Sequence, residues 1–313
     1  MNVEQTERGT VLSEQVMLAS VHVSQGSKKV RDLTHASKLA AQEDADNDLV
    51  NVTTSLLNKA FPRSTKLAGL IYAAHRTLTF QLPRNGGGQM KGPGVLANKL
   101  AERYLDEITD LINQFDTAAD EECEALPAFV SKERHRLGKM FDFTNYPDPD
   151  TMRERFGASV HLDGLPKVES ISAGSYTQSQ QSMAQEKQDQ IADSMGKQIL
   201  IRLLEHVSHM ANVTGKENGK VFNSLLGNVR ELAEVIIPCC NVNNDPELTK
   251  IAADLRKVLV YSDDQIRNAP TARQHVAKES AKVAAKIGEY AKAQGVTKAD
   301  LTATAQQKAA SYF

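Results

Sequence analysis

Residues Gln178 to Asn212 read QSQQSMAQEKQDQIADSMGKQILIRLLEHVSHMAN, and this stretch decides the fold. It contains no proline and only one glycine, Gly196. Its second half repeats apolar residues at steps of three and four, the pattern of one helix face. These residues are Ala192, Met195, Ile199, Leu203, Val207 and Met210. At about 1.5 Å per residue the helix would be roughly 50 Å long, so we expect a scaffold of long helices.

The first half of the same stretch is polar and rich in glutamine. Glutamine stands at Gln178, Gln180, Gln181, Gln185, Gln188 and Gln190. The apolar half has to be buried, whereas the polar half must project into water or meet a partner. We interpret the polar half as a helical arm suited to self-association, which predicts a homo-oligomer.

Composition narrows the class of protein. The chain has 313 residues, enough for one large domain or two modest ones. Aromatic residues make up 5% and tryptophan is absent, which favours helix-on-helix packing over a β-sandwich. The net charge of −2 gives no global attraction to nucleic acid or membrane. Three cysteines, two of them adjacent, fit a reducing intracellular compartment, and no apolar stretch is long enough to span a membrane.

The remaining segments predict mainly helices. Alternating β-branched residues indicate strands at Val16–Ser24 and 158–162, which we expect to pair in a small sheet. Helices are predicted over 49–61, 67–82, 95–123, 127–140, 221–237, 246–260 and 272–294. Pro238 is expected to stop one of them, and Asp245 to cap the next with Pro246 at its first position.

These elements predict a mainly α fold, a long-helix bundle with a small antiparallel β element. The chain divides into an N-terminal helical region over 1–170, which holds the β element, and a C-terminal helical region over 171–313. One continuous domain is the alternative.

Residues 83–94 read PRNGGGQMKGPG, with five glycines and two prolines in twelve residues. No regular element persists in such a segment, so it is either a plain flexible loop or a loop that closes on a ligand. It is not a P-loop, because the lysine is followed by glycine rather than serine or threonine. The residues of interest are Arg84, Gly86, Gly87, Gly88 and Lys91.

The C-terminal helix offers the best candidate surface for a polyanion. Lys278, Lys282 and Lys286 recur along one side at spacings of four, and Arg273 and Lys292 add to the basic residues of this helix. Such a row can follow a phosphate backbone, and the binding would then depend strongly on salt. The alternative is a solvated face opposite an apolar seam. The first interpretation predicts binding of single-stranded DNA or another nucleic acid.

His206 and His209, with Glu205, stand on the predicted central helix as candidate metal ligands. Two histidines three residues apart on a helix can bind one metal ion, but no third ligand follows at a spacing typical of a metal site. A surface pair is the alternative. No nucleophile elbow, carboxylate cluster or dinucleotide-binding glycine pattern is present. We therefore expect no cofactor and a protein that is not an enzyme, with a metal-dependent enzyme using the two histidines as an alternative.

Residues 100–127, 136–166 and 222–259, which include Tyr146-Pro147, Phe156 and Asp245-Pro246, together resemble an uncharacterised family of tailed-bacteriophage proteins. The resemblance covers roughly Val16 to Ala285 and follows the order of a long helix, a Tyr-Pro turn, a short strand, a long helix and an Asn-Leu-Arg-Glu-Leu-like helix. The matching residues are Tyr146, Pro147, Arg153, Arg155, Phe156, Pro166, Asn228, Arg230, Glu231, Leu232, Asp245, Pro246 and Glu247. The glycine-rich loop departs from the family because no aromatic residue follows Phe80 there.

This resemblance implies a phage gene product made in the cytoplasm of the infected bacterium, and it implies no activity. Together with the residues, it leads us to expect a non-enzymatic binding or assembly protein, with nucleic acid as a possible partner through the C-terminal helix. A protein that binds and inhibits a host factor, for example in anti-defence, is the alternative.

Overall fold

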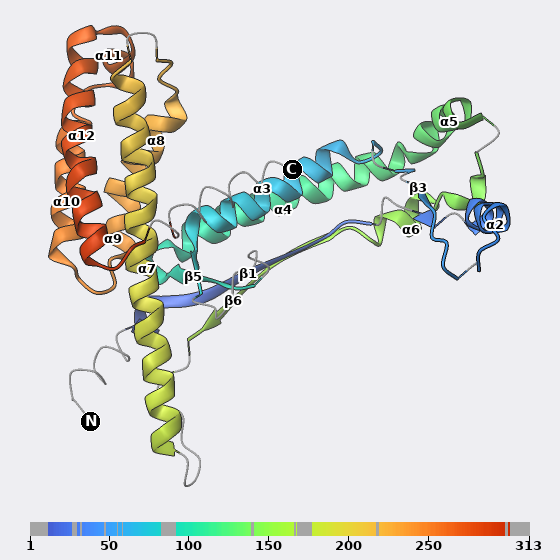
Figure 1. Ribbon diagram of the computed structural model, residues 1–313, viewed down its shortest axis with the longest axis horizontal. Helices are drawn as coiled ribbons and strands as arrows, with labels where there is room; N and C mark the ends of the chain where they lie inside the picture. The colour runs from blue at the N-terminus through green and yellow to red at the C-terminus, as the bar shows by residue number, and fades with distance from the viewer. Residues whose placement is uncertain are drawn as a thin grey trace. The chain divides into compact units, whose positions relative to one another are not determined.

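The structure of the chain is a computed structural model, shown in Figure 1. It describes residues 12–26, 30–31, 33–46, 48–54, 56–57, 59–82, 92–138, 141–165, 167, 177–216, 219–297 and 300. The fold is mainly α with a small antiparallel sheet, as the sequence predicts.

The chain forms two compact units, and neither is one continuous segment. Unit 1 gathers Met1–Ala19, Leu78–Ala101 and Leu162–Phe313, and unit 2 gathers Ser20–Thr77 and Glu102–His161. The sequence predicts one boundary near residue 170, whereas the chain passes between the units four times. Each unit is described on its own below.

Unit 1 is built on α7 (Thr177–Thr214), a helix of 38 residues. Every predicted position of its apolar face, from Ala192 to Met210, is buried. The helix α12 (Pro270–Ala293) packs along α7, as Figure 1 shows. The other helices of this bundle are α8 (Asn223–Glu231), the π-helical turn η6 (Leu232–Ile236), α9 (Ile237–Cys240), α10 (Pro246–Val258) and α11 (Asp263–Asn268).

The start of α10 follows from local sequence chemistry. The Asp245 carboxylate accepts hydrogen bonds from the backbone N–H groups of Glu247, at 2.8 Å, and Leu248, at 3.4 Å. Pro246 stands at the first helical position, where its missing N–H costs nothing. The predicted cap is therefore confirmed.

The sheet has the strand order β4-β5-β1-β6. It consists of β4 (Phe80–Gln81), β5 (Gly94–Ala97), β1 (Val16–Ser24) and β6 (Gly157–Gly164). β5 is antiparallel to both of its neighbours, with Val16 opposite Ala97 and Phe80 opposite Val95. The predicted pairing of the two long strands, β1 and β6, is confirmed.

A side-chain amide of α7 covers the free edge of this sheet within unit 1. Gln198 accepts the N–H of Gln81 at 2.8 Å and donates to its carbonyl at 2.9 Å, so it acts as a one-residue strand partner. One turn later, Arg202 donates to the carbonyl of Thr79 and lies over the ring of Phe80, 4.7 Å from its centroid. Burial lowers the pKa of Arg202 to about 10.

Unit 2 is built on a helical hairpin, α3 (Pro62–Leu78) and α4 (Ala101–Glu124), whose helices lie side by side in Figure 1. It also holds β2 (Val30–Arg31), α2 (Leu33–Gln42), β3 (Thr53–Thr54), α5 (Leu126–Leu137), η3 (Phe143–Asn145) and α6 (Pro149–Arg153). The ring of Phe156 packs against Phe61 and Phe115, at centroid distances of 4.9 and 6.1 Å.

Contacts at both ends fix the register of the hairpin. Glu122 of α4 is buried, and its carboxylate accepts the N–H groups of Arg63 and Ser64 at 2.7 and 3.1 Å. It therefore satisfies two of the N–H groups that the first turn of α3 leaves open. At the other end, Nδ1 of His75 lies 2.8 Å from the hydroxyl of Tyr104. These contacts make α3 and α4 antiparallel.

Four helix predictions differ from the structure. Residues 49–61 contain no helix among the described positions but include β3, and α3 begins at Pro62. Residues 95–97 belong to β5, and the following long helix begins at Ala101. The helix predicted over 67–82 covers 62–78 instead, and Phe80–Gln81 form β4. Finally, the helix predicted to stop at Pro238 continues to Cys240. In the first two cases, strand pairing outweighs the local helical period.

Candidate binding surfaces

The predicted row of cations on α12 is largely neutralised within unit 1. Nζ of Lys282 lies 2.7 Å from a carboxylate oxygen of Glu279. Nζ of Lys286 lies 3.1 Å from carboxylate oxygens of both Glu247 and Asp254, on α10. These pairs hold the pKa of Lys286 above its usual value, through hydrogen bonds to Asp254 and Glu247.

Arg273, the first of the row, is tied to the end of α7. Its guanidinium donates to the carbonyl groups of Thr214, Val213, Lys216 and Gly219. Carbonyls at a helix C-terminus have no partner inside the helix, so a cation that binds them stabilises the helix end. The side chain thus joins the start of α12 to the last turn of α7.

Of the five predicted cations, Lys278 and Lys292 remain exposed and make no described ion pair. Two lysines are fewer than the five-residue row from which the sequence predicts a nucleic-acid site. Nucleic-acid binding through α12 stays a prediction, with a smaller charged surface than the sequence indicates.

The two predicted histidines lie on α7 in unit 1. His206 is partly buried and His209 is exposed. Within the described ranges, no group of three or more His, Cys, Asp or Glu side chains is placed to hold a metal ion. The glycine-rich loop, with Arg84, Gly86, Gly87, Gly88 and Lys91, lies outside the described residues.

The continuation of the helix past Pro238 has a specific cause. In η6 the N–H of Ile237 bonds to the carbonyl of Leu232, five residues back. In the same register, position 238 would donate to the carbonyl of Ala233, but proline has no N–H. Arg256 of α10 donates to that carbonyl instead, at 2.9 Å. A side chain from another helix therefore replaces the missing backbone donor.

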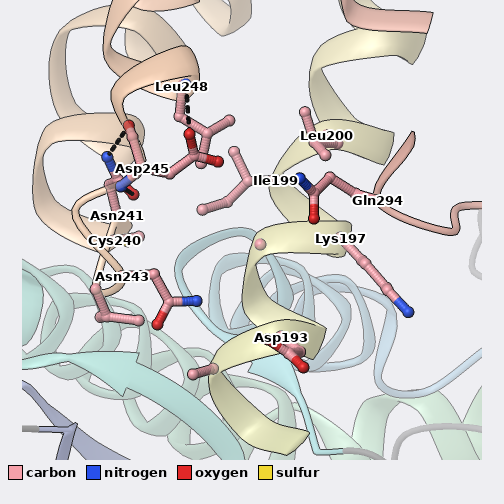
Figure 2. Close-up of a pocket in the computed structure, with 13 residues that line it drawn as sticks. Asp193, Lys197, Ile199, Leu200, Cys240, Asn241, Asn243, Asp245, Leu248 and Gln294 are labelled. Atoms are coloured by element: carbon pink, nitrogen blue, oxygen red, sulfur yellow. Dashed lines mark hydrogen bonds between the residues drawn. The ribbon is translucent and has the colours of Figure 1, made fainter. Parts of the chain in front are cut away.

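This distorted helix leads into a small pocket of about 180 Å³ between α7 and the α9–α10 turn, shown in Figure 2. Gly196, Ile199 and Leu200 contribute from α7, and Gly196 leaves open space where a Cβ would stand. The other lining residues are Ala192, Asp193, Lys197, Cys240, Asn241, Val242, Asn243, Asp245, Leu248 and Gln294.

Three polar side chains that line the pocket, those of Cys240, Asp245 and Asn241, are either protonated or already hydrogen-bonded within the chain. Burial raises the pKa of the Cys240 thiol to about 12, so at neutral pH it is protonated and a poor nucleophile. The Asp245 carboxylate caps α10 and also accepts the hydroxyl of Tyr290 at 2.5 Å. Asn241 is occupied too, because its amide exchanges two hydrogen bonds with the backbone of Asp245.

The strongest surface feature is the separation of charge in the α3–α4 hairpin. The sequence of α3 contains Arg63, Lys66 and Arg76 and no acidic residue. The sequence of α4 contains nine acidic residues and one cation, Arg103. In α4, Asp120 pairs with Arg153 and Glu121 pairs with Arg63.

The first turns of α4 hold its unneutralised acidic residues. Glu102, Asp106 and Glu107 are exposed and make no described ion pair, and exposed Asp110 accepts only a hydrogen bond from Gln114. Acidic residues four apart on a helix repel each other by a few tenths of a kcal/mol per pair. The chain therefore retains this negative face at a small cost in stability.

The outer face of α3 combines cations with exposed apolar side chains. Leu70 and Tyr72 are 43% and 38% exposed, and Lys66 and Arg76 are exposed on the same helix. Leu70 and Tyr72 are two residues apart, so they project from different sides of α3, and each is a single exposed apolar side chain beside a cation. Sequence reasoning missed this surface, although the charge count of the two segments would have revealed it.

Comparisons of the chain with protein-family profiles, curated proteins and solved structures find no match. No helix in the described part of the chain is both long and apolar enough to cross a membrane.

Proposed function

We propose that this chain is a non-enzymatic binding and assembly protein that associates with further copies of itself through helix surfaces. The observation that carries the proposal is the charge separation in the hairpin, with cations on α3 and acidic residues on α4. A surface that carries both signs in separate stripes is complementary to a second copy of itself. Complementary charge speeds association and selects the partner and its orientation.

The exposed arm of α7 supports the same proposal. Gln178, Gln180 and Glu186 are exposed, and Met183 is 57% exposed. On the opposite side Gln188 is buried, so this segment has one packed face and one open face. An open polar helix face can contact a partner without exposing an aggregation-prone apolar patch.

On the resemblance to tailed-phage proteins, we place this assembly in the cytoplasm of an infected bacterium. There, a host protein or a nucleic acid could be a further ligand of the assembled form. Neither ligand is needed for the self-association.

Sedimentation velocity of the full chain tests the proposal over a concentration range from about 1 to 100 μM at low salt. The expected result is a mass that rises with concentration towards a dimer or larger oligomer. A strict monomer over the whole range would contradict the proposal.

A further inference from the structure

We propose that the pocket between α7 and the α9–α10 turn binds a free α-amino acid with an aliphatic side chain of about the size of leucine. The ammonium group of the ligand meets Asp193, its carboxylate meets Lys197, and its side chain enters the apolar part of the pocket. This inference goes beyond the proposed function and does not depend on self-association.

The inner lining of the pocket is apolar. Five side chains form it, each 8% exposed or less: Ala192, Ile199, Leu200, Cys240 and Leu248. The volume of about 180 Å³ slightly exceeds the about 150 Å³ of a cavity that holds one benzene molecule. A branched aliphatic side chain therefore fits, and its burial should raise the affinity about ten- to a hundredfold.

Gly196 gives a ligand access to the backbone of α7. A Cβ at this position would meet no neighbouring atom within 4 Å, so the space beside the helix is open. Glycine is a poor helix former, and Gly196 is the only glycine in the 38 residues of α7. The helix therefore gives up some stability at a place where a larger residue would fill the pocket.

Two opposite charges stand at the rim without pairing with each other. Asp193 and Lys197 are exposed and four residues apart, a spacing and order that favour an ion pair, yet neither makes a described ion pair. Nζ of Lys197 lies 3.8 Å from the position of a Cβ at Gly295. Hydrogen bonds from Thr297, and to a smaller extent Lys197, lower the pKa of Asp300. Because the stem of lysine is flexible, this exposed ammonium can turn from the end of α12 to the mouth of the pocket.

Asn243 and Gln294 add neutral hydrogen-bonding groups at the same rim. Asn243 is exposed, its amide makes no described hydrogen bond, and it extends towards α7 in Figure 2. Gln294 donates to the hydroxyl of Tyr290 at 3.0 Å, which leaves its carbonyl oxygen as an acceptor. One amide that can donate or accept and one further acceptor suit a ligand that carries both N–H groups and a carboxylate.

The charges at the rim select a zwitterion over a singly charged ligand. Asp193 and Lys197 are separated by about 6 Å along the helix, and Gly196 lies between them. An α-amino acid carries its ammonium and carboxylate on one carbon, which can lie over Gly196. An amine alone would face Lys197, and a carboxylate alone would face Asp193, so repulsion between like charges would weaken binding of either.

The wall across from α7 has an irregular backbone. It follows the π-helical turn η6, and in the turn before α10 Asn244 has a φ of 50°, in the left-handed region that few residues other than glycine adopt. Both conformations are concentrated at functional sites in proteins. Their position beside the pocket supports a binding role for it.

Titration of the full chain with four related probes, followed by NMR chemical shifts, tests the ligand class. L-Leucine should bind with a dissociation constant of about 0.1 to 1 mM, given its size. 3-Methylbutylamine lacks the carboxylate and 4-methylpentanoate lacks the ammonium, so each should bind at least about tenfold more weakly. Free glycine lacks the side chain and should also bind at least about tenfold more weakly.

Two glycine variants test the location. Gly196→Leu places a side chain in the pocket and should reduce the affinity for leucine at least about tenfold. Gly227→Leu is the matched control, because Gly227 is also a helical glycine with open space for a Cβ but does not line the pocket. It should leave the dissociation constant unchanged within about twofold. Leucine is a better helix former than glycine at both positions, and circular dichroism checks that both variants fold.

Two charge variants test the roles of the rim residues. Asp193→Asn should weaken binding of leucine at least about tenfold but should not weaken binding of 4-methylpentanoate. Lys197→Gln should weaken binding of leucine but should not weaken binding of 3-methylbutylamine. A general loss of structure would reduce the affinity for all probes alike.

The outcomes decide the inference separately from the proposed function. Absence of leucine binding to the native chain at about 10 mM overturns it. Equal affinity for leucine and for either singly charged probe overturns the zwitterion, and equal affinity of the Gly196 and Gly227 variants overturns the location. Each of these results leaves self-association standing, because sedimentation measures self-association without any ligand.

Discussion

The helices α4 and α12 are alike in sequence pattern but differ in how their charges are used. Each has 24 residues, an apolar seam and a charged outer face. On α12, Lys282 and Lys286 are paired with carboxylates, and Arg273 binds backbone carbonyls. On α4, the acidic residues from Glu102 to Asp110 meet no described cation. The cations of α12, which the sequence presents as a binding site, therefore mainly stabilise unit 1. The acidic residues of α4, which the sequence does not single out, stay exposed without a described ion pair.

This difference shows that neither the net charge of the chain nor the pattern of a single helix reveals which charges stay exposed and unpaired in the fold. A net charge of −2 conceals one helix with nine acidic residues and a neighbour with none. An exposed ion pair contributes little to stability, but it removes the charge from the field that a partner meets. A charged stripe is therefore a candidate site only when neighbouring elements do not neutralise it.

The largest expected effect concerns the structural role of α12. Replacing Arg273 with Met removes the donor to two carbonyls in the last turn of α7 and to two in the segment just after it, and should destabilise that junction by about 3 kcal/mol. Lys278→Met, on the same helix, should change stability by less than about 0.5 kcal/mol. Hydrogen exchange in peptides covering 205–220 measures both. Equal effects of the two variants would remove the distinction between the paired and the open cations of α12.

A smaller effect is expected for the carboxylate that holds the hairpin of unit 2 together. Glu122→Ala leaves the N–H groups of Arg63 and Ser64 without their acceptor and should cost about 2 kcal/mol. Glu124→Ala, at an exposed position of the same helix, serves as the control and should be nearly neutral. The measurement is hydrogen exchange in the first turns of α3. Unchanged exchange in the Glu122 variant would contradict a capping role.

The hairpin of unit 2 should also be sensitive to acid, through the buried imidazole of His75. Burial, with a smaller effect of Arg76, lowers the pKa of His75 from 6.5 to about 4. Between these values the unfolded chain binds a proton that the folded chain does not, so stability falls as the pH decreases. From pH 7 to 4.5 the loss should be about 2 kcal/mol.

His75→Gln is the matched variant for this acid effect, because it can still bond to Tyr104 but cannot titrate. Urea unfolding of unit 2, followed by exchange in α3 peptides, should show the extra acid sensitivity in the native chain only. The same sensitivity in both chains would assign it to other groups.

The smallest expected effect is nucleic-acid binding by α12. With only Lys278 and Lys292 open, the logarithm of affinity for a single-stranded oligonucleotide should fall with the logarithm of salt at a slope of about −1.4 or shallower. Fluorescence anisotropy at several salt concentrations gives the slope. A slope near −3.5 would correspond to about five phosphate contacts, and it would restore the whole row as a binding surface.

Most of the features that the sequence predicts correctly are local ones, and the pairing of β1 with β6 is the exception. The cap Asp245 with Pro246 depends on adjacent residues, and the buried face of α7 depends on a period sustained over many turns. The continuation past Pro238 depends on Arg256, a residue of another helix, so no local pattern reveals it. The loss of helix at 49–61 likewise follows from pairing of Thr53 and Thr54 with another segment.

The same reasoning explains the candidate sites. Lys286 is neutralised by Asp254, 32 residues away in the chain. The sequence therefore predicts the row of cations, but it does not predict that a residue of another helix neutralises part of it. The hairpin surface, by contrast, was visible in the composition of two segments. Only their antiparallel contact, fixed by Glu122 and His75, makes that composition a surface.

The central claim is that the open charges of the hairpin, and not the row of cations on α12, form the working surface. Covalent footprinting of carboxylates and lysines, read by mass spectrometry at about 1 and 100 μM chain, tests it directly. Labelling of Glu102, Asp106, Glu107 and Asp110 should fall at the higher concentration, while labelling of Lys278 and Lys292 stays constant. Unchanged carboxylate labelling, or protection of the α12 lysines instead, would contradict the account.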